Sequence, residues 1–367
     1  MIPRRRFLNL AALSAAALAL SPACATRSYD LDPRRERRRF ARVHVSPDRV
    51  IRTITGLRPY RASGFVLRSE RIGDKLLVHD YGHGGGGITL SWGTAQLAVD
   101  ELQGWTGVKD RCAVVGCGAV GLATARLLQR RGIAVTIYAK DLPPNTTSNI
   151  AGGQWSPYSV FDAGKTTTAF DDQFARAAKL SWRLFQDLQF STYGIRWIEN
   201  YSLNDRPYTN PPNPLFVDHE DLGPGEHPFP ARYARRFTTM LIETSIYLEA
   251  LLREFRLAGG RIVGREFGAA EQIRALEEPV IFNCTGLGAR PLFNDDELIP
   301  AKGQLSVLLP QPEIDYIVLA QHGYMFPRSD GILLGGTFER GNWSLDPDPE
   351  AETRIVGEHK RFFDAMR

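Results

Sequence analysis

Residues 112–121 read CAVVGCGAVG, an apolar run that leads into the glycine pattern G-x-G-x-x-G. A helical pattern follows at 122–131, and residues 133–138 alternate as in a second strand. In this context the glycines allow a tight turn, a close approach of the backbone to a pyrophosphate, and close packing of the helix on the strand. The helix N-terminus also attracts phosphates through its free N–H groups. The sequence therefore predicts an α/β protein with a Rossmann-like, dinucleotide-binding domain, and the residues expected at the phosphates are Gly116, Gly118, Ala119, Val120 and Gly121.

The glycine pattern alone does not choose between NAD and FAD. Such folds place an acidic residue after the second strand, where it binds the ribose. Here Ala139-Lys140-Asp141 stands at that point, so the acid is not where it is expected. The cofactor must be identified from other segments.

Composition excludes several classes of protein. The chain has 367 residues, of which 43% are hydrophobic and 23% charged, as in a globular protein with a sizeable core. Residues 1–45 contain ten Arg and three acidic residues, so the remaining chain carries a net charge of −3 and nothing favours a nucleic-acid partner. The four cysteines have neither zinc-site nor redox-motif spacing.

The N-terminus has the pattern of an export signal. Residues 4–8 read RRRFL, an apolar run continues to Leu20, and residues 23–25 read ACA. This pattern predicts a twin-arginine signal peptide over 1–25, and hence a periplasmic or otherwise extracytoplasmic protein. Lipid attachment at Cys24 is an alternative, although Ser21 fits it poorly. Residues 26–45 are expected to form a basic tether.

The segment after the second strand carries a family resemblance. Residues 138–158 read YAKDLPPNTTSNIAGGQWSPY, which closely resembles the D-amino-acid oxidase family, where this segment wraps FAD. Residues 280–286 (VIFNCTG), 302–304 (KGQ) and 324–343 (YMFPRSDGILLGGTFERGNW) are also similar to family segments. The resemblance therefore implies FAD as the cofactor and disfavours an NAD-dependent dehydrogenase.

The segments stand in an unusual order. Residues 56–61 (GLRPYR) and 81–93 (YGHGGGGITLSWG) resemble the closing section of the family, yet here they precede the glycine loop. We interpret this order as a circular permutation, with a new joint at 103–111. The alternative is a separate small N-terminal domain, which is too short to bury its own apolar runs well.

The resemblance also implies roles for individual residues. Arg58 would bind the substrate carboxylate through its guanidinium fork, Tyr324 would assist it, and the carbonyl of Gly85 would accept the substrate amine. The pocket for the substrate side chain would be lined by Gln154, Tyr158 and Phe326. Further flavin contacts are implied for Thr146, Thr147, Ser148, Gly153, Gln154, Gly84, Gly85, Gly87, Ile88, Thr89 and Phe267. We interpret His83 as a hydrogen-bonding brace rather than a base.

The implied reaction is oxidation of a small D-amino acid to a 2-oxo acid, with hydride leaving the α-carbon for flavin N5 and with oxygen as the second substrate. Phe338 stands where the D-aspartate branch has an arginine, which favours neutral substrates. Two alternatives remain open. One is a related oxidoreductase acting on D-aspartate, glycine or secondary amines, with oxygen or another electron acceptor. The other is a non-catalytic FAD-binding exported protein. No metal is expected, and the sequence does not give the oligomeric state.

The architecture expected from these patterns is a parallel FAD-binding sheet with helices, joined to a mixed or antiparallel substrate sheet. Helices are expected at 94–102, 170–188, 245–257 and 349–366. The expected division of the chain is 46–155 FAD-binding (a module at 50–102 and a Rossmann core at 111–155), 156–250 substrate part, 251–305 FAD-binding, and 306–367 substrate part with a terminal helix.

Overall fold

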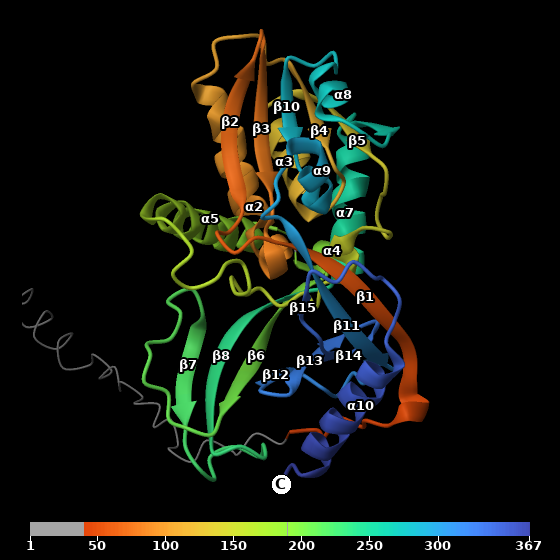
Figure 1. Cartoon of the computed structure of the whole chain (residues 1–367). Coiled ribbons are helices and arrows are strands. Elements are labelled where there is room, and N and C mark those ends of the chain that lie inside the picture. The colour runs from red at the N-terminus through yellow and green to blue at the C-terminus, as the bar shows by residue number, and fades with distance from the viewer. Residues whose placement is uncertain (1–39, 189) are drawn as a thin grey trace, which may run out of the picture. The chain divides into compact units, whose positions relative to one another are not determined.

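Two β-sheets, of six and nine strands, organise the chain in the computed structural model, which describes residues 40–188 and 190–367 (Figure 1). The six-stranded sheet has the order β2-β3-β10-β4-β5-β9. Neighbouring strands in it are parallel except β2, which runs antiparallel to β3, so this sheet is mixed rather than fully parallel as expected. Its strands are β2 (Val66–Ile72), β3 (Lys75–Tyr81), β4 (Arg111–Val115), β5 (Ala134–Ala139), β9 (Arg261–Gly264) and β10 (Val280–Asn283).

Helices cover both faces of the six-stranded sheet. Along β4, Cys112 and Val114 face the core formed with α2, α3 and α7, while Ala113 and Val115 face α8 and α9. This alternation follows from the two-residue period of a strand, and burial on both faces explains why residues 112–115 of β4 are all apolar. The helices are α2 (Gly87–Asp100), α3 (Ala119–Arg130), α7 (Thr244–Leu257), α8 (Ala270–Arg274) and α9 (Ala289–Phe293).

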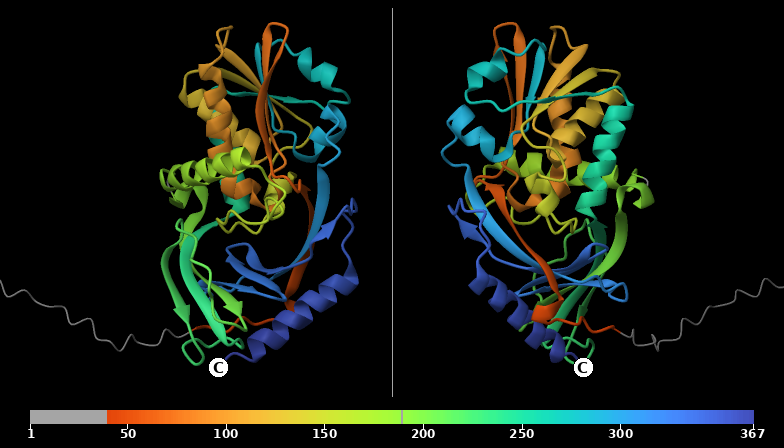
Figure 2. Two further views of the ribbon diagram at one scale, coloured as in Figure 1. Left: turned by 60° about the vertical axis from the view of Figure 1, so that its left-hand side comes forward. Right: turned by 90° about the vertical axis from the view of Figure 1, so that its right-hand side faces the viewer.

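The nine-stranded sheet has the order β1-β11-β14-β13-β12-β6-β8-β7, and β15 pairs separately with β11. Most neighbours are antiparallel, but β12 and β6 are parallel, so this sheet is also mixed. Helix α10 (Pro349–Asp364) packs on β11 and β14, as Figure 2 shows. The strands are β1 (Val50–Tyr60), β6 (Ile195–Asn204), β7 (Val217–Leu222), β8 (Tyr233–Ile242), β11 (Ile299–Leu308), β12 (Tyr316–Ala320), β13 (Gly323–Arg328), β14 (Gly331–Gly335) and β15 (Glu339–Arg340).

Shorter elements connect the sheets. Helix α4 (Thr147–Ile150) follows β5, and α5 (Thr168–Gln186) packs on α2, with Thr167 capping its first turn through a 3.2 Å bond from the Phe170 N–H. Helix α6 (Phe190–Tyr193) precedes β6. Single 3-10 turns lie at Pro47–Arg49, Gly84–Gly86, Glu101–Gln103 and Gly286–Gly288.

The segment before residue 103 belongs to both sheets. Strand β1 pairs along its length with β11, with Arg58 opposite Ala301, whereas β3 pairs with β10, with His79 beside Asn283. This segment is therefore not a separate small domain. Strand β1 also lies in the nine-stranded sheet, although 46–155 was expected to be FAD-binding. Strand β11 likewise crosses the expected boundary between 305 and 306.

Helix α2 begins at Gly87, seven residues earlier than expected. The stretch GITLSWG contains two glycines and two β-branched residues, which are poor helix formers. Tertiary packing explains the helix, since a Cβ at Gly93 would lie 1.9 Å from the carbonyl oxygen of Ala177 in α5. Gly93 is thus required by the close approach of the two helices, and local propensity is overridden.

Residues 41–45 are not part of a solvated tether. Val43 and Val45 are buried, the Arg42 guanidinium donates to the Met366 carbonyl at 2.6 Å, and the Tyr316 hydroxyl donates to the Ala41 carbonyl at 2.7 Å. Val43 and Val45 stand on either side of His44 and form a short buried segment. The many arginines around this segment hid it from the sequence analysis. The predicted signal peptide and the tether up to residue 39 lie outside the described residues. Among the described helices none has the length and apolar character needed to span a bilayer.

Candidate active site

The two glycine-rich segments follow the ends of β3 and β4, the two strands on either side of β10. Strand β3 leads into the turn Gly84–Gly86, β4 leads into the loop 116–121, and β10 lies between them, with His79, Asn283 and Val115 in register. Because adjacent strands are about 4.8 Å apart, the ends of β3 and β4 are separated by about 10 Å. The carboxyl ends of parallel strands are where α/β folds bind their ligands.

The loop 116–121, called the glycine loop from here on, meets the steric demands predicted for it. Gly116 has φ +113°, and a Cβ there would lie 2.3 Å from the Cys284 carbonyl oxygen at the end of β10. A Cβ at Gly121 would lie 2.2 Å from the Gly116 carbonyl oxygen, so this glycine lets α3 sit close to β4. The first turn of α3 carries no acidic side chain, so Ala119 and Val120 begin a helix that repels no phosphate.

The predicted flavin-wrapping segment reaches the same helix end. The Ser148 hydroxyl accepts a 3.0 Å hydrogen bond from the Ala119 N–H, and Thr146 is 9% exposed with its hydroxyl bonded to Asn149 at 2.8 Å. Thr147 is the first residue of α4. Gly153 has φ +93°, and a Cβ there would lie 2.1 Å from the Ile242 carbonyl oxygen, so the chain joins the end of β8 closely at this point.

The turn Gly84–Gly86, called the glycine turn, has no room for a Cβ at two of its positions because other parts of the chain lie against it. A Cβ at Gly84 would lie 2.5 Å from the Ser159 carbonyl oxygen, and one at Gly86 would lie 2.6 Å from Val160. The Gly85 N–H donates to that Ser159 carbonyl at 2.8 Å. Residues 158–162, called the covering loop, therefore dock on this turn.

The start of α2 is tied to the segment that follows Gly153. The Thr89 hydroxyl accepts a bond from the Ser156 N–H at 3.0 Å and donates to the Ser156 carbonyl at 3.1 Å. Ile88 is buried in the core beneath, while Gly87 has no contact closer than 3.9 Å at its Cβ position. Thr89 thus joins two segments that were both predicted to contact the cofactor.

Arg58 lies flat on the face of the nine-stranded sheet. A Cβ at Gly303 of β11 would lie 2.1 Å from Arg58 Nη1, so the guanidinium occupies the space that this glycine leaves free. Nη1 is buried and has no hydrogen-bond partner among the described residues. A buried cationic donor without an acceptor is costly, so this atom is suited to an anionic ligand.

Tyr324 lies on the same face of the same sheet. Residues directly opposite each other in a sheet share a face, as do residues two or four apart on one strand. Arg58 is opposite Ala301 of β11, and Leu305, four residues later on β11, is opposite Gly335. Gly335 is in turn opposite Tyr324, so Arg58 and Tyr324 share a face. The Tyr324 ring lies over Gly335, and its hydroxyl is 3.5 Å from the Cβ position of Gly336. Gly336 in turn approaches the carbonyl of Gln304, the residue next to Gly303. The two side chains therefore lean toward one region of the sheet.

The three predicted pocket residues, Gln154, Tyr158 and Phe326, differ in how close they lie to Tyr324 and in how exposed they are. The Phe326 ring stacks on Tyr324 at 4.6 Å and lies against Gly152, so it belongs to the same face. The Gln154 side-chain amide donates a 2.6 Å hydrogen bond to the Asn200 side chain, and its backbone forms an isolated antiparallel β-bridge with Leu241. Tyr158 is 59% exposed, and its ring is 6.4 Å from Phe216, at the start of the covering loop.

Phe338 lies beside Arg58 in a cluster that the sequence did not single out. Its ring centre is 5.6 Å from Cζ of both Arg58 and Arg340, and it meets the Tyr60 ring edge-on at 5.8 Å. Arg340 is paired with Asp162 of the covering loop at 2.7 Å. Arg340 lies in the family-like segment 324–343 but was given no role, and Asp162 stands before Ala-Gly, which is typical of an ordinary turn.

His83 is a brace, as interpreted from the sequence. Its Nε2 lies 3.0 Å from the Thr94 hydroxyl and 3.2 Å from Asp80 Oδ1, and its ring stacks on Phe65 at 5.1 Å. Asp80 is fully buried, and burial raises the pKa of its carboxyl, an effect that the hydrogen bond with His83 opposes. The His83 ring is thus held by Thr94, Asp80 and Phe65.

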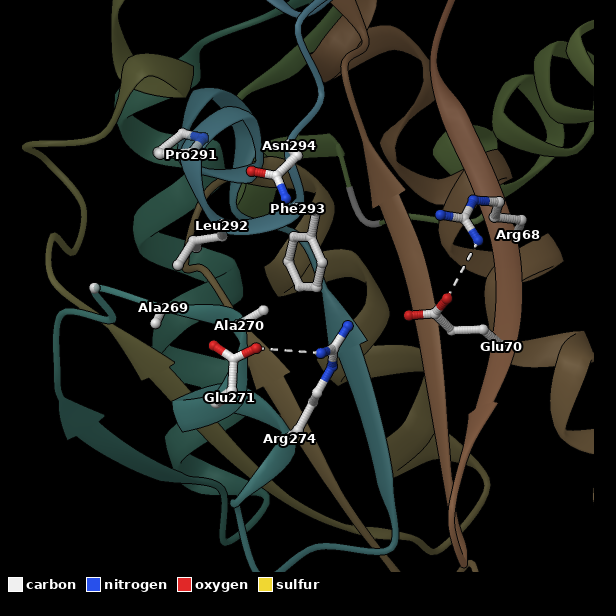
Figure 3. Close-up of a pocket in the computed structure, with 11 residues that line it drawn as sticks. Arg68, Glu70, Ala269, Ala270, Glu271, Arg274, Pro291, Leu292, Phe293 and Asn294 are labelled. Carbon is white, nitrogen blue, oxygen red and sulfur yellow. Dashed lines mark hydrogen bonds and ion pairs between the residues drawn. The ribbon is translucent and has the colours of Figure 1, made fainter.

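A separate pocket of about 360 Å³ lies on the α8 and α9 face of the six-stranded sheet (Figure 3). Its arginines are paired with glutamates, Arg68 with Glu70 at 3.5 Å and Arg274 with Glu271 at 3.4 Å. None of the predicted site residues lines it. Phe267, a predicted flavin contact, precedes one of its lining residues in the chain, and its ring centre lies 6.2 Å from that of Tyr138 of β5. The described residues include no cluster of side chains able to hold a metal ion.

The profile of the family described as "DAO: FAD dependent oxidoreductase" matches residues 111–366. The chain belongs to this family. It is 31% identical over 264 residues to a D-amino-acid oxidase of Rubrobacter xylanophilus, covering 68% of this chain and 76% of that protein. It is also 31% identical over 256 residues to a D-amino-acid oxidase of Streptomyces coelicolor, covering 66% and 74%.

The fold is shared with solved flavoenzymes of this DAO family type. A glycine oxidase from Geobacillus kaustophilus superposes with a TM-score of 0.52 at 16% identity, over 70% of this chain and 80% of that one. The protein is thus an FAD-dependent oxidase of the amino-acid oxidase type, and its residues fit the cofactor. The glycine loop leads into α3, whose first turn has no acidic side chain to repel a diphosphate, and Arg58 offers a buried donor to a bound anion.

Proposed function

We propose that this DAO family member oxidises neutral D-amino acids to 2-imino acids, which water hydrolyses to 2-oxo acids and ammonia, while oxygen is reduced to hydrogen peroxide. The observation that carries the proposal is Arg58, whose buried Nη1 has no partner among the described residues. A guanidinium binds a carboxylate through two parallel hydrogen bonds, which fix the orientation of the ligand as well as its charge. When bound, FAD supplies the two-electron acceptor.

The other groups complete the binding of an α-amino acid. Tyr324 leans toward the same region and can donate its hydroxyl to the carboxylate, while the Gly85 carbonyl provides an acceptor for the amine. These groups hold the carboxylate and the amine, and the predicted pocket at Phe326 would hold the side chain, so that only one enantiomer presents its α-hydrogen to the oxidant. His83 is held by Thr94 and Phe65, so we assign it no role as a base.

Phe338 supports a preference for neutral side chains. It places an aromatic ring 5.6 Å from Arg58 Cζ. Arg340 lies near the same ring, but both of its outer nitrogens bind Asp162, at 2.8 and 2.7 Å, so its charge is already compensated. An acidic substrate would bring a second carboxylate to a place without an unpaired cation.

Anaerobic mixing of the purified yellow protein with D- and L-amino acids tests this function. We expect D-alanine and larger neutral D-amino acids to bleach the flavin, D-aspartate to do so at least tenfold less efficiently, and L-enantiomers not to react. Bleaching by glycine or secondary amines alone, or by none of the panel, would contradict the proposal.

We also propose that the chain is a circular permutation of the family fold. The family profile begins at residue 111, yet β1 to β3 lie before it and complete both sheets. Arg42 and Met366 are in contact, so a short linker can join these ends. A variant that starts at Lys109, links Arg367 to Ala41 through a few glycines, and ends at Gly104 is expected to bind FAD and turn over normally. A variant that fails to fold would count against the proposal.

Finally, we propose export through the twin-arginine route, supported by the RRRFL and ACA segments. Replacing Arg4 and Arg5 by lysine is expected to keep the protein in the cytoplasm with its flavin. Cys24→Ala separates lipid attachment from simple cleavage. If Cys24 carries a lipid, the wild-type protein is found in the membrane fraction and the variant is released from it. If the signal peptide is only cleaved, both proteins are found in the soluble fraction.

A further inference from the structure

The covering loop fixes the peptide that presents the Gly85 carbonyl. The Gly85 N–H donates to the Ser159 carbonyl at 2.8 Å, and the Gly86 N–H donates to the His83 carbonyl at 2.9 Å. In a planar trans peptide the carbonyl points opposite to the N–H, so the second bond sets the direction of the Gly85 carbonyl. The first bond sets the position of the whole turn against Ser159.

Ser159 is itself held in an unusual conformation. Its φ is +58°, in the left-handed region that residues with a Cβ rarely adopt, so the surrounding structure must impose it. Val160, the next residue, is 1% exposed and packs at Gly86. The loop is therefore docked and not a free surface segment.

The restraint at the far end of the loop is Asp162. Its two carboxylate oxygens accept bonds from both outer nitrogens of Arg340, at 2.8 and 2.7 Å, and from the Tyr60 hydroxyl at 2.6 Å. The bonds from Arg340 and Tyr60 hold the pKa of Asp162 at about 2, so this carboxylate stays charged at neutral pH. A two-point bond from a guanidinium restrains orientation as well as distance.

Tyr60 connects this restraint to the glycine turn. Its side chain is 2% exposed, the Arg340 guanidinium lies 4.6 Å from its ring centre, and its Cδ2 is 3.2 Å from the Cβ position of Gly84. The strand that carries Tyr60 also carries Arg58, two residues earlier. The assembly thus contacts the glycine turn, near the proposed amine site, and shares β1 with Arg58 at the proposed carboxylate site.

We propose that Asp162, Arg340 and Tyr60 form a latch that positions the Gly85 carbonyl for the substrate amine through Ser159. This inference rests on the proposed function. All three are positioning residues, because none is proposed to touch the substrate. The latch should therefore matter for ligands that carry an amine, and not for ligands held through the carboxylate alone.

Two matched ligands separate these cases. D-Alanine and isobutyrate share the carboxylate and the methyl group, but isobutyrate has a second methyl in place of the amine. For Asp162→Ala we expect the Kd of D-alanine, from anaerobic flavin bleaching, to rise at least tenfold, while the Kd of isobutyrate, from the flavin absorbance change, stays within twofold. Asp162→Asn and Arg340→Gln should give the same split with smaller rises.

Arg52→Ala is the matched control. Arg52 also lies on β1 and pairs with a carboxylate, Asp330, at 2.6 Å with comparable exposure, but it does not contact the covering loop. We expect both dissociation constants to stay at wild-type values. Equal losses for the two ligands in Asp162→Ala, or no loss for either, would overturn the latch.

Hydrogen exchange provides a readout that does not depend on activity. With the FAD-loaded protein, we expect the Gly85 amide to exchange at least tenfold faster in Asp162→Ala than in wild type, with Arg52→Ala unchanged. Unchanged exchange would refute the latch even if the enzyme is active. A wild-type protein that no amino acid reduces would refute the proposed function, while the exchange result would still decide whether Asp162 holds the turn.

Discussion

The glycine loop and the glycine turn look alike in sequence but depend on different parts of the chain. In the glycine loop, the atoms that exclude a Cβ are backbone oxygens of the loop itself and of the adjacent strand end, Gly116 and Cys284. In the glycine turn they belong to Ser159 and Val160, more than seventy residues away. The first is thus part of the scaffold, and the second is a docking site between segments. We expect damage to the first to affect the whole fold and damage to the second to remain local.

The largest expected effect is that of Gly116→Ala. Its φ of +113° and a Cβ position 2.3 Å from a backbone oxygen combine strain with a clash that no side chain can relieve, at a cost on the order of 3 kcal/mol or more. We expect loss of bound FAD and a markedly lower Tm, measured by flavin content and thermal unfolding. Gly132→Ala, with φ +75° in open space, should cost only about 1 kcal/mol. Similar losses for the two variants would mean that packing at the loop is unimportant.

Arg58→Ala is expected to come next, and it separates function from fold. Removing the carboxylate partner should cost about 2–5 kcal/mol, or roughly 30- to 5,000-fold in kcat/KM. Flavin content and Tm should be near wild type or higher, because a buried donor without a protein partner is lost. Arg58→Lys keeps the charge and loses the fork, so it should recover little. Near-normal turnover by Arg58→Ala would show that the site lies elsewhere.

Gly84→Ala tests the docking directly, with Gly73→Ala as its control. Both glycines have positive φ, +55° and +60°, but only Gly84 has an atom, the Ser159 oxygen, within 2.5 Å of its Cβ position, whereas Gly73 has nothing within 4 Å. We expect thermal unfolding to show a loss of about 1–3 kcal/mol beyond that of Gly73→Ala. FAD should be retained and D-amino-acid turnover reduced. Equal losses of stability in Gly84→Ala and Gly73→Ala would mean that only the positive φ, and not the contact with Ser159, requires a glycine at position 84.

The smallest expected effect comes from Asp80, on the strand that leads into the glycine turn. Burial raises the pKa of its carboxyl, opposed by His83, so the fold favours the neutral form. The stability that this group contributes is therefore present below its unfolded pKa and declines as the pH rises through its folded pKa. We expect Asp80→Asn to stabilise the protein by about 1 kcal/mol at pH 8 and by little at pH 4. A Tm difference that shrinks with rising pH would contradict this sign.

These two regions also mark how far sequence reasoning reaches. The glycine loop could be predicted in detail, because its steric partners lie in the pattern itself or at the end of a neighbouring strand. Arg58 and Tyr324 were predicted only through family resemblance, and the strand register that brings them to one face could not be derived from either segment. The predicted start of α2 was seven residues too late, because the helix depends on a tertiary contact with α5 at Gly93 that the local sequence does not reveal.

Other residues gave no usable pattern. Ser159, Asp162 and Arg340 acquire their roles from where the covering loop crosses β1 and β15, which depends on the packing of three distant segments. The burial of Val43 and Val45 was likewise hidden, since two valines beside many arginines give no periodic pattern long enough to interpret. Local motifs are thus predictable from composition and spacing, whereas contacts between segments require the assembled fold.

The pairing of β1 with β11 and of β3 with β10 has a consequence for biosynthesis. Arg58 pairs with Ala301, and His79 pairs with Asn283. During synthesis, both sheets therefore stay incomplete until strands more than two hundred residues later have been made. At ribosomal speeds of about 5–20 residues per second, these strands remain unpaired for roughly 10–50 seconds. A nascent chain of this kind needs protection from aggregation, so its yield in a cell should depend on holdase chaperones more than its final stability would suggest.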